Sequence, residues 1–229
     1  MGASEGRGGD ADDRAPANPM ISGQFIAQLG LDRDKVPSWK DFPFCLSAVR
    51  HLDNIDLHPS VTFFVGENGS GKSTLLEAIA VAWGFNPEGG SRHFQFGSRP
   101  SHSVLQRYIR FSRGVKRARD GYFLRAESFF NVATQIEELD EEFDNIPRIA
   151  DAYGSRPLHE QSHGESFLSL MLNRFGGRGL YVLDEPEAAL SPGRQMAVLS
   201  RMHDLVRQDS QFIVATHSPI IMALSLIHI

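Results

Sequence analysis

The chain has 229 residues, of which 41% are hydrophobic and 22% are charged, and this ordinary globular composition predicts a single domain with a sizeable core. Its formal net charge of −5 argues against a protein that binds nucleic acid with its whole surface. The one cysteine, Cys45, cannot form an internal disulfide, and no stretch approaches the roughly 18 apolar residues of a membrane span. We therefore expect a cytoplasmic protein that does not insert into a membrane.

The first half of the chain begins with a polar tail. Residues 1–18 are rich in Gly, Ala and Asp, and we expect them to be disordered, with one domain over residues 19–229. Apolar segments predict strands at 42–49 and 61–65, and residues 73–83 have the composition of a buried helix.

We expect residues 86–160 to form an inserted helical lobe. It opens with a loop rich in Gly, Ser and Pro, and seven Arg and Lys residues follow between positions 107 and 125. An acidic run at 137–144 comes next.

The last part of the chain alternates between helices and strands. The pattern predicts helices at 162–174 and 192–207, and strands at 180–183 and 212–215. Short connections between alternating strands and helices indicate an α/β fold with a mainly parallel sheet flanked by helices.

A GxxxxGK[ST] motif follows the strand predicted at 61–65. Its glycines let the backbone curl so that N–H groups face phosphate oxygens, and the helix that starts behind them favours negative charge. We expect Lys72 to reach the β- and γ-phosphates of a nucleotide, Ser73 to ligate Mg²⁺, and Thr74 to lie near the α-phosphate. A chance match is the alternative, but a strand before the motif and a helix after it favour nucleotide binding. The predicted phosphate-binding residues are Gly66, Glu67, Asn68, Gly69, Ser70, Gly71, Lys72, Ser73 and Thr74.

The strand predicted at 180–183 ends in two carboxylates, within the sequence GLYVLDEPEAALSP. Behind a P-loop, Asp184 is expected to hold Mg²⁺, and Glu185 to polarise the attacking water. The alternative is an acidic turn capped by Pro186. We expect Glu187 to face solvent without a role.

His217 ends the last predicted strand, in the sequence VATHSP. A lone histidine is more often structural, but α/β sheets bind ligands at the carboxyl ends of their strands. We expect His217 to donate a hydrogen bond to the γ-phosphate.

The segment QSHGES has two interpretations. Ser162 and Glu165 have the spacing of a capping box at the start of a helix. The same residues could form half of a nucleotide site whose other half lies on a second molecule. The segment alone does not decide between them.

The order of these motifs resembles the ABC-type ATPase head over roughly residues 42–219. With VGENGSGKSTLLEAIA, LRAESFF, QSHGES, DEPEAALSP and THSP, the chain looks most like the stand-alone ATPases often labelled AAA-family, which are relatives of SMC and RecF heads. Two subunits of such heads sandwich two ATPs. The resemblance implies an ATP-dependent homodimer in which Ser162, Gly164 and Glu165 contact the nucleotide of the other subunit.

The resemblance also implies three further features. Glu127 occupies a place where a contact to Mg²⁺ or its water is expected. Trp39, Phe42 and Phe44 are candidates to stack on adenine. Such heads usually continue with another strand, whereas only twelve residues follow His217, so we expect a truncated or non-native C-terminus.

The function predicted first is Mg²⁺-dependent ATP hydrolysis that drives a switching or mechanical step. One alternative is the nucleotide-binding subunit of an ABC transporter. Against it, residues 161–165 are QSHGE where LSGGQ is usual, and a transporter Q-loop glutamine is not evident. The other alternative is an ATP-gated DNA repair or defence module that binds nucleic acid through residues 107–125. The interpretation favoured for this basic segment is a solvated hairpin balanced by the acidic run.

Overall fold

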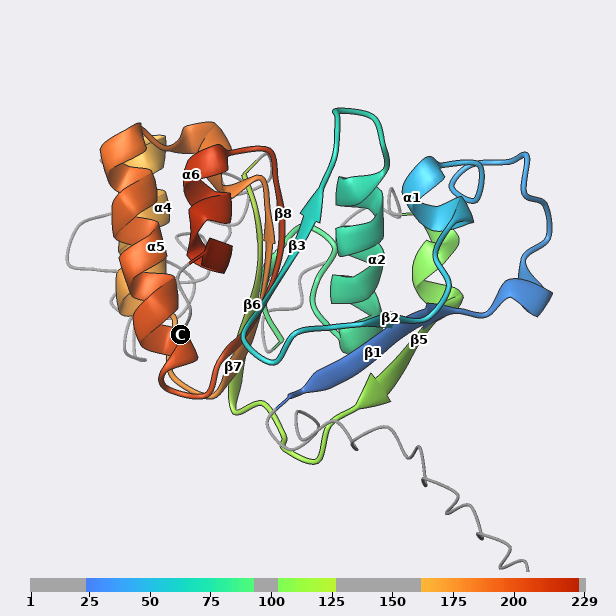
Figure 1. Ribbon diagram of the computed structural model, residues 1–229, viewed down its shortest axis with the longest axis horizontal. Coiled ribbons are helices and arrows are strands. Elements are labelled where there is room, and N and C mark those ends of the chain that lie inside the picture. Colours follow the sequence, from blue (N-terminus) through green and yellow to red (C-terminus); the bar gives the residue numbers. More distant parts are fainter. Residues whose placement is uncertain (1–23, 93–102, 127–161, 227–229) are drawn as a thin grey trace, which may run out of the picture.

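The computed structural model describes residues 24–92, 103–126 and 162–226 (Figure 1). The tail expected at 1–18, the acidic run and Glu127 lie outside the described residues, as does most of the range expected as an inserted lobe.

A five-stranded sheet forms the centre of the molecule, with strand order β3-β8-β7-β6-β4. Four neighbouring strands run parallel, and the short edge strand β4 pairs antiparallel to β6. This arrangement confirms the predicted α/β fold with a mainly parallel sheet. The strands are β3 (Val61–Val65), β4 (Gly90–Ser91), β6 (Asp120–Arg125), β7 (Gly179–Asp184) and β8 (Gln211–Thr216).

Alternation along the central strands divides the core into two layers, because successive side chains of a strand point to opposite faces. In β7, Leu180 and Val182 pack on the side of helix α2 (Lys72–Trp83). Tyr181 and Leu183 pack on the other side, against the helices in the left half of Figure 1. Those helices are α4 (His163–Asn173), α5 (Pro192–Val206) and α6 (Pro219–Met222).

A second, antiparallel sheet lies on the α2 side, with strand order β2-β1-β5 (Figure 1). Its apolar side chains join the same core layer as α2. The strands are β1 (Ile26–Leu31), β2 (Ile55–Asp56) and β5 (Ile109–Arg113). The short helices of the described residues are α1 (Ser47–Arg50) and the 3₁₀ turns η2 (Arg33–Lys35), η3 (Val104–Arg107), η6 (Pro186–Ala189) and η7 (Ala223–Leu226).

The strand predicted at 42–49 is wrong. This segment forms turns and then α1. Pro43 lies near its start and has no N–H to donate to a neighbouring strand. The segment instead packs on the P-loop: the Ala48 N–H donates to the Ser70 carbonyl at 3.2 Å.

Part of the range expected as an inserted lobe belongs to the sheet. β6 is an inner strand, paired to β7 along its whole length. β5 belongs to the other sheet, so the basic segment 107–125 is not a hairpin. The sequence pattern did not assign β5 and β6 to these sheets, because their partner strands, β1 and β7, lie far away along the chain. Among the described residues, no helix combines the length and the apolar character that crossing a membrane requires.

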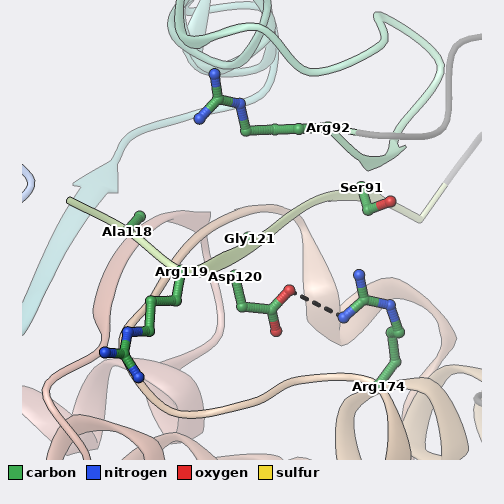
Figure 2. Close-up of a pocket in the computed structure, with 7 residues that line it drawn as sticks. All are labelled: Ser91, Arg92, Ala118, Arg119, Asp120, Gly121 and Arg174. Atoms are coloured by element: carbon green, nitrogen blue, oxygen red, sulfur yellow. Dashed lines mark hydrogen bonds and ion pairs between the residues drawn. The ribbon is translucent and has the colours of Figure 1, made fainter.

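Asp120 ties the amino ends of β6 and β7 to the end of α4. Its carboxylate accepts hydrogen bonds from Arg174 Nη1 and the Gly176 N–H, both at 2.9 Å, and lies 2.8 Å from the Tyr181 hydroxyl. Figure 2 shows the contact between Asp120 and Arg174. Both residues line a hollow of about 290 Å³. Burial raises the pKa of Asp120, but these hydrogen bonds and the Arg174 charge outweigh burial and hold the pKa below its ordinary value. Burial, with the nearby Asp120 charge, raises the pKa of Tyr181.

We predict that Asp120→Asn lowers the free energy of unfolding at pH 7 by about 2 kcal/mol, because Arg174 loses a charged partner in a half-buried place. The folded-state pKa of Asp120 is lowered, so its contribution is present above the unfolded pKa of about 3.9 and is lost as the pH falls through the folded value. Urea unfolding between pH 7 and pH 3 should therefore show the difference between wild type and variant closing below about pH 4.

Asp209→Asn is the matched control, because Asp209 pairs with Lys116 on the surface, where the two side chains are 62% and 38% exposed. Its effect should stay below about 0.5 kcal/mol. A difference for Asp120→Asn that is equally large at pH 7 and pH 3 would contradict the assignment.

Candidate functional site

The P-loop connects β3 to α2 at the carboxyl edge of the parallel sheet. Gly69 and Gly71 have φ values of 79° and 97°, the left-handed region that favours glycine. At Gly71, a Cβ would also lie 3.0 Å from the Leu46 Cβ. Backbone conformation and space therefore both require glycine where the loop turns into the helix.

Lys72 is buried, with 6% of its surface exposed. Its ammonium donates to the carbonyls of Gly66 at 2.7 Å and Glu67 at 2.9 Å. The charge is thereby held inside the curve of the loop, where the sequence predicts phosphates. Thr74 is half-buried in the first turn of α2, whereas Glu67, Asn68 and Gly69 are exposed at the loop's tip.

Ser73 and Asp184 meet although they lie far apart in the sequence. Asp184 is the last residue of β7 and is 6% exposed, and Ser73 Oγ donates to its Oδ1 at 2.9 Å. Mg²⁺ takes oxygen ligands in an octahedron at about 2.0–2.1 Å, which puts neighbouring ligand oxygens about 2.9 Å apart. The two side chains therefore fit Mg²⁺ in both chemistry and spacing.

Arg125 is a site neighbour that the sequence reasoning missed. It is opposite Asp184 in the β6–β7 register. Its Nε lies 3.7 Å from Asp184 Oδ2, and its Nη1 donates to Glu77 Oε2 at 2.8 Å. The equal spacing of DGYFLR and GLYVLD could have indicated this placement, but only if the two segments were known to pair.

Glu185 is the residue after Asp184, and its backbone has the left-handed conformation, with φ 49°. Its N–H donates to the Ala215 carbonyl at 3.0 Å, which fixes it beside the end of β8. Its Oε1 lies 3.9 Å from His217 Nδ1, and both side chains are partly exposed. The expected water-orienting carboxylate and the expected γ-phosphate donor therefore share one edge of the sheet with the P-loop.

Glu187 is buried, and the expectation that it faces solvent is wrong. It is 7% exposed, and its Oε1 accepts hydrogen bonds from Thr216 Oγ1 and the N–H groups of His217 and Ser218. The donors lie 29 to 31 residues downstream, so no local pattern points to them. The η6 turn brings Glu187 inward toward the end of β8.

The start of α4 has the predicted capping box. The Ser162 N–H donates to Glu165 Oε2 at 3.0 Å, and the Ser162 hydroxyl lies 2.9 Å from the same oxygen. Arg194, at the start of α5, donates to Glu165 Oε1 at 2.9 Å and lies 3.4 Å from Ser162 Oγ. Ser162 and Glu165 are exposed, and Gly164 is buried. The cap is confirmed, and the contact to a second subunit stays a prediction.

The three adenine-stacking candidates have different environments. Phe44 is 2% exposed and packs edge-on against Tyr108. One face of Trp39 is covered by the Arg33 guanidinium, 4.4 Å from the ring centre. Phe42 is 65% exposed, so its ring is the most accessible of the three.

The basic segment is largely engaged in contacts within the chain. Arg110 donates to the Leu31 carbonyl, and Arg113 lies over the Trp83 ring. Lys116 pairs with Asp209. Nucleic-acid binding through 107–125 stays a prediction.

The sequence model of a family described as an AAA domain matches residues 43–153. An uncharacterized ABC transporter ATP-binding protein of Haemophilus influenzae is 25% identical over 193 residues, which cover 76% of this chain and 70% of that protein. The DNA replication and repair protein RecF of Colwellia psychrerythraea is 72% identical over 25 residues, 11% of this chain and 7% of RecF.

Two solved structures are similar to the chain. The SMC head domain from Thermotoga maritima superposes with a TM-score of 0.42 and 17% identity, covering 88% of this chain and 92% of that one. A metal-chelate type ABC transporter in an inward-facing conformation superposes with a TM-score of 0.41 and 22% identity, covering 72% of this chain and 65% of that one. The chain is thus similar to AAA-domain proteins over residues 43–153 and to an ABC-type ATP-binding protein over most of its length, with the P-loop set between β3 and α2.

Proposed function

We propose that the chain binds ATP with Mg²⁺ and hydrolyses it as a homodimer in which each nucleotide lies between two subunits. The hydrolysis drives a switching or mechanical step in the cytoplasm. The observation that carries this proposal is the 2.9 Å contact between Ser73 Oγ of the P-loop and Asp184 Oδ1 at the end of β7. This contact supports Ser73 and Asp184 as a metal-binding pair, with the buried Lys72 and the carboxylate of Glu185 nearby.

For each step of the proposed reaction, a suitable residue lies at the carboxyl edge of the parallel sheet. The P-loop N–H groups and the Lys72 ammonium bind the phosphates. Ser73 and Asp184 would hold Mg²⁺, which would supply positive charge to neutralise the phosphate oxygens. Glu185 orients a water and accepts its proton while the water oxygen attacks the γ-phosphorus. The bond between that phosphorus and the β–γ bridging oxygen breaks, giving ADP and phosphate. His217 donates a hydrogen bond to the γ-phosphate.

The exposed start of α4 is the proposed contact to the second subunit. An α-helix presents unpaired N–H groups and a partial positive charge at its N-terminus. Ser162 lies there, with Arg194 beside it as a second positive group. In the dimer, Ser162, Gly164 and Glu165 would face the γ-phosphate held by the other subunit's P-loop.

The transporter alternative is kept because the Haemophilus influenzae relative is described as an ABC transporter ATP-binding protein. It requires a membrane partner, so reproducible cofractionation of the native chain with membranes would favour it over a stand-alone dimer.

We predict that Glu185→Gln lowers kcat by at least about 100-fold, because the amide cannot accept the proton of the attacking water. ATP affinity should change little, since Glu185 is expected to act on water and not on the nucleotide. Phosphate release and binding of a fluorescent ATP analogue measure the two quantities. A variant that hydrolyses ATP as fast as wild type would exclude Glu185 from the reaction.

We also predict that two inactive variants restore activity when mixed. Lys72→Ala removes the phosphate-binding ammonium, and Ser162→Arg blocks the contact to the other subunit. A mixed dimer holds one site with both lesions and one intact site. With random pairing, about half of the dimers are mixed, and activity should recover to about a quarter of the wild-type value per subunit.

Phosphate release from the 1:1 mixture and from each variant alone checks this, after thermal unfolding shows that both variants fold. Specific activity of wild type should also rise with protein concentration. A mixture no more active than its components, together with flat specific activity, would leave Ser162 as a helix cap only.

A further inference from the structure

The Glu187 carboxylate lies between the η6 turn and the segment that joins β8 to α6. Its side chain is 5% exposed. Oε1 accepts from Thr216 Oγ1 at 2.7 Å, from the His217 N–H at 2.8 Å and from the Ser218 N–H at 3.1 Å. Three donors on one oxygen offset the cost of burying a carboxylate, and they are three consecutive residues.

The same oxygen also contacts the imidazole. His217 Nδ1 lies 3.3 Å from Glu187 Oε1, and 3.9 Å from Glu185 Oε1. Glu187 therefore touches both the backbone and the ring of His217. Its other oxygen, Oε2, is buried and has no hydrogen-bond partner in the described structure.

A closed set of contacts surrounds this carboxylate. Ser218 Oγ donates to Gln195 Oε1 at 2.7 Å, and Gln195 Nε2 donates to the Leu190 carbonyl at 3.1 Å. Leu190 directly follows η6, the turn that carries Glu187. The turn and the His217 segment are thus joined twice, through Glu187 and through α5.

We propose that Glu187 is a positioning residue that holds His217 at the nucleotide site and makes its placement depend on the η6 turn. Glu185 begins the same turn, so one segment sets both the carboxylate that orients water and the histidine that contacts phosphate. This inference rests on the proposed ATP hydrolysis, because the position of His217 affects a reaction only if a nucleotide binds beside it.

The test uses Glu187→Gln in the full chain. Glutamine keeps the size and one acceptor oxygen but loses the charge that faces the imidazole. We expect kcat to fall about tenfold, with KM for ATP changed less than about twofold, because misplacing a group that acts on the reacting phosphate affects the chemical step. Glu187→Ala should lower kcat further, and thermal stability too.

A double variant separates positioning from general destabilisation. If Glu187 acts through the His217 ring, Glu187→Gln should have no additional effect on kcat in a His217→Ala background. If the two losses multiply, the carboxylate acts independently of the ring and the proposal is overturned. Asp120→Asn is the matched control: it weakens a carboxylate cluster at the opposite edge of the sheet, and its kcat should equal that of wild type.

A readout without nucleotide separates this inference from the proposed function. The ¹⁵N signals of the His217 ring, assigned by their loss in His217→Gln, should shift in Glu187→Gln and stay in place in Asp120→Asn. Unchanged signals in Glu187→Gln would overturn the inference whether or not the protein hydrolyses ATP. A shift in a protein that shows no hydrolysis would support the contact while removing the proposed function.

Discussion

The hydrogen bond from Ser73 to Asp184 joins residues 111 positions apart, and the site depends on it. It exists only because β3 and β7 flank β8 in parallel, so that the three strands end at one edge. A shift of one residue in the β7–β8 register would turn Asp184 to the opposite face of the sheet, away from α2, since successive side chains of a strand face opposite sides. The packing of the two core layers therefore fixes the register and, through it, the spacing of the oxygens that fit Mg²⁺.

The two edges of this sheet have different roles. At the amino edge, Asp120 is satisfied by Arg174, Gly176 and Tyr181, all within the chain. At the carboxyl edge, Glu185 is partly exposed and Glu187 has one unsatisfied oxygen. Saturated contacts stabilise the fold, whereas groups left open can bind or react.

Local patterns in the sequence were sufficient for much of this structure. The P-loop and its flanking strand and helix, the buried strands around Leu180 and Phe212, and the capping box at Ser162 all follow from residues close together in the chain. The sheet β2-β1-β5 could not be predicted in the same way. β2 has two residues, and β1 and β5 are identified as strands only by pairing across about 80 positions.

The same limit explains which site residues were missed. In the sequence, Arg125 is one of several basic residues close together, and only the pairing of β6 with β7 shows that it lies opposite Asp184. In the sequence, Arg194 is an ordinary residue of the first turn of α5, and only the packing of α4 beside α5 shows that it contacts Glu165. The sequence gives the charge of a side chain, but its contact partner depends on the fold. The basic segment shows the converse, because side chains that look like one patch in the sequence are divided between two sheets.

The turn after β7 shows how one short segment gives two similar carboxylates different surroundings. Glu185 adopts a left-handed backbone, which costs a non-glycine residue about 1 kcal/mol, and Pro186 then starts η6. The reversal leaves Glu185 at the partly exposed edge and brings Glu187 inside, two residues later. A relaxed extended backbone would place residues 185 and 187 on the same face of a strand, because the side-chain period there is two. The strained residue is thus what separates a partly exposed carboxylate from a buried one that contacts His217, and the proposed nucleotide site needs both.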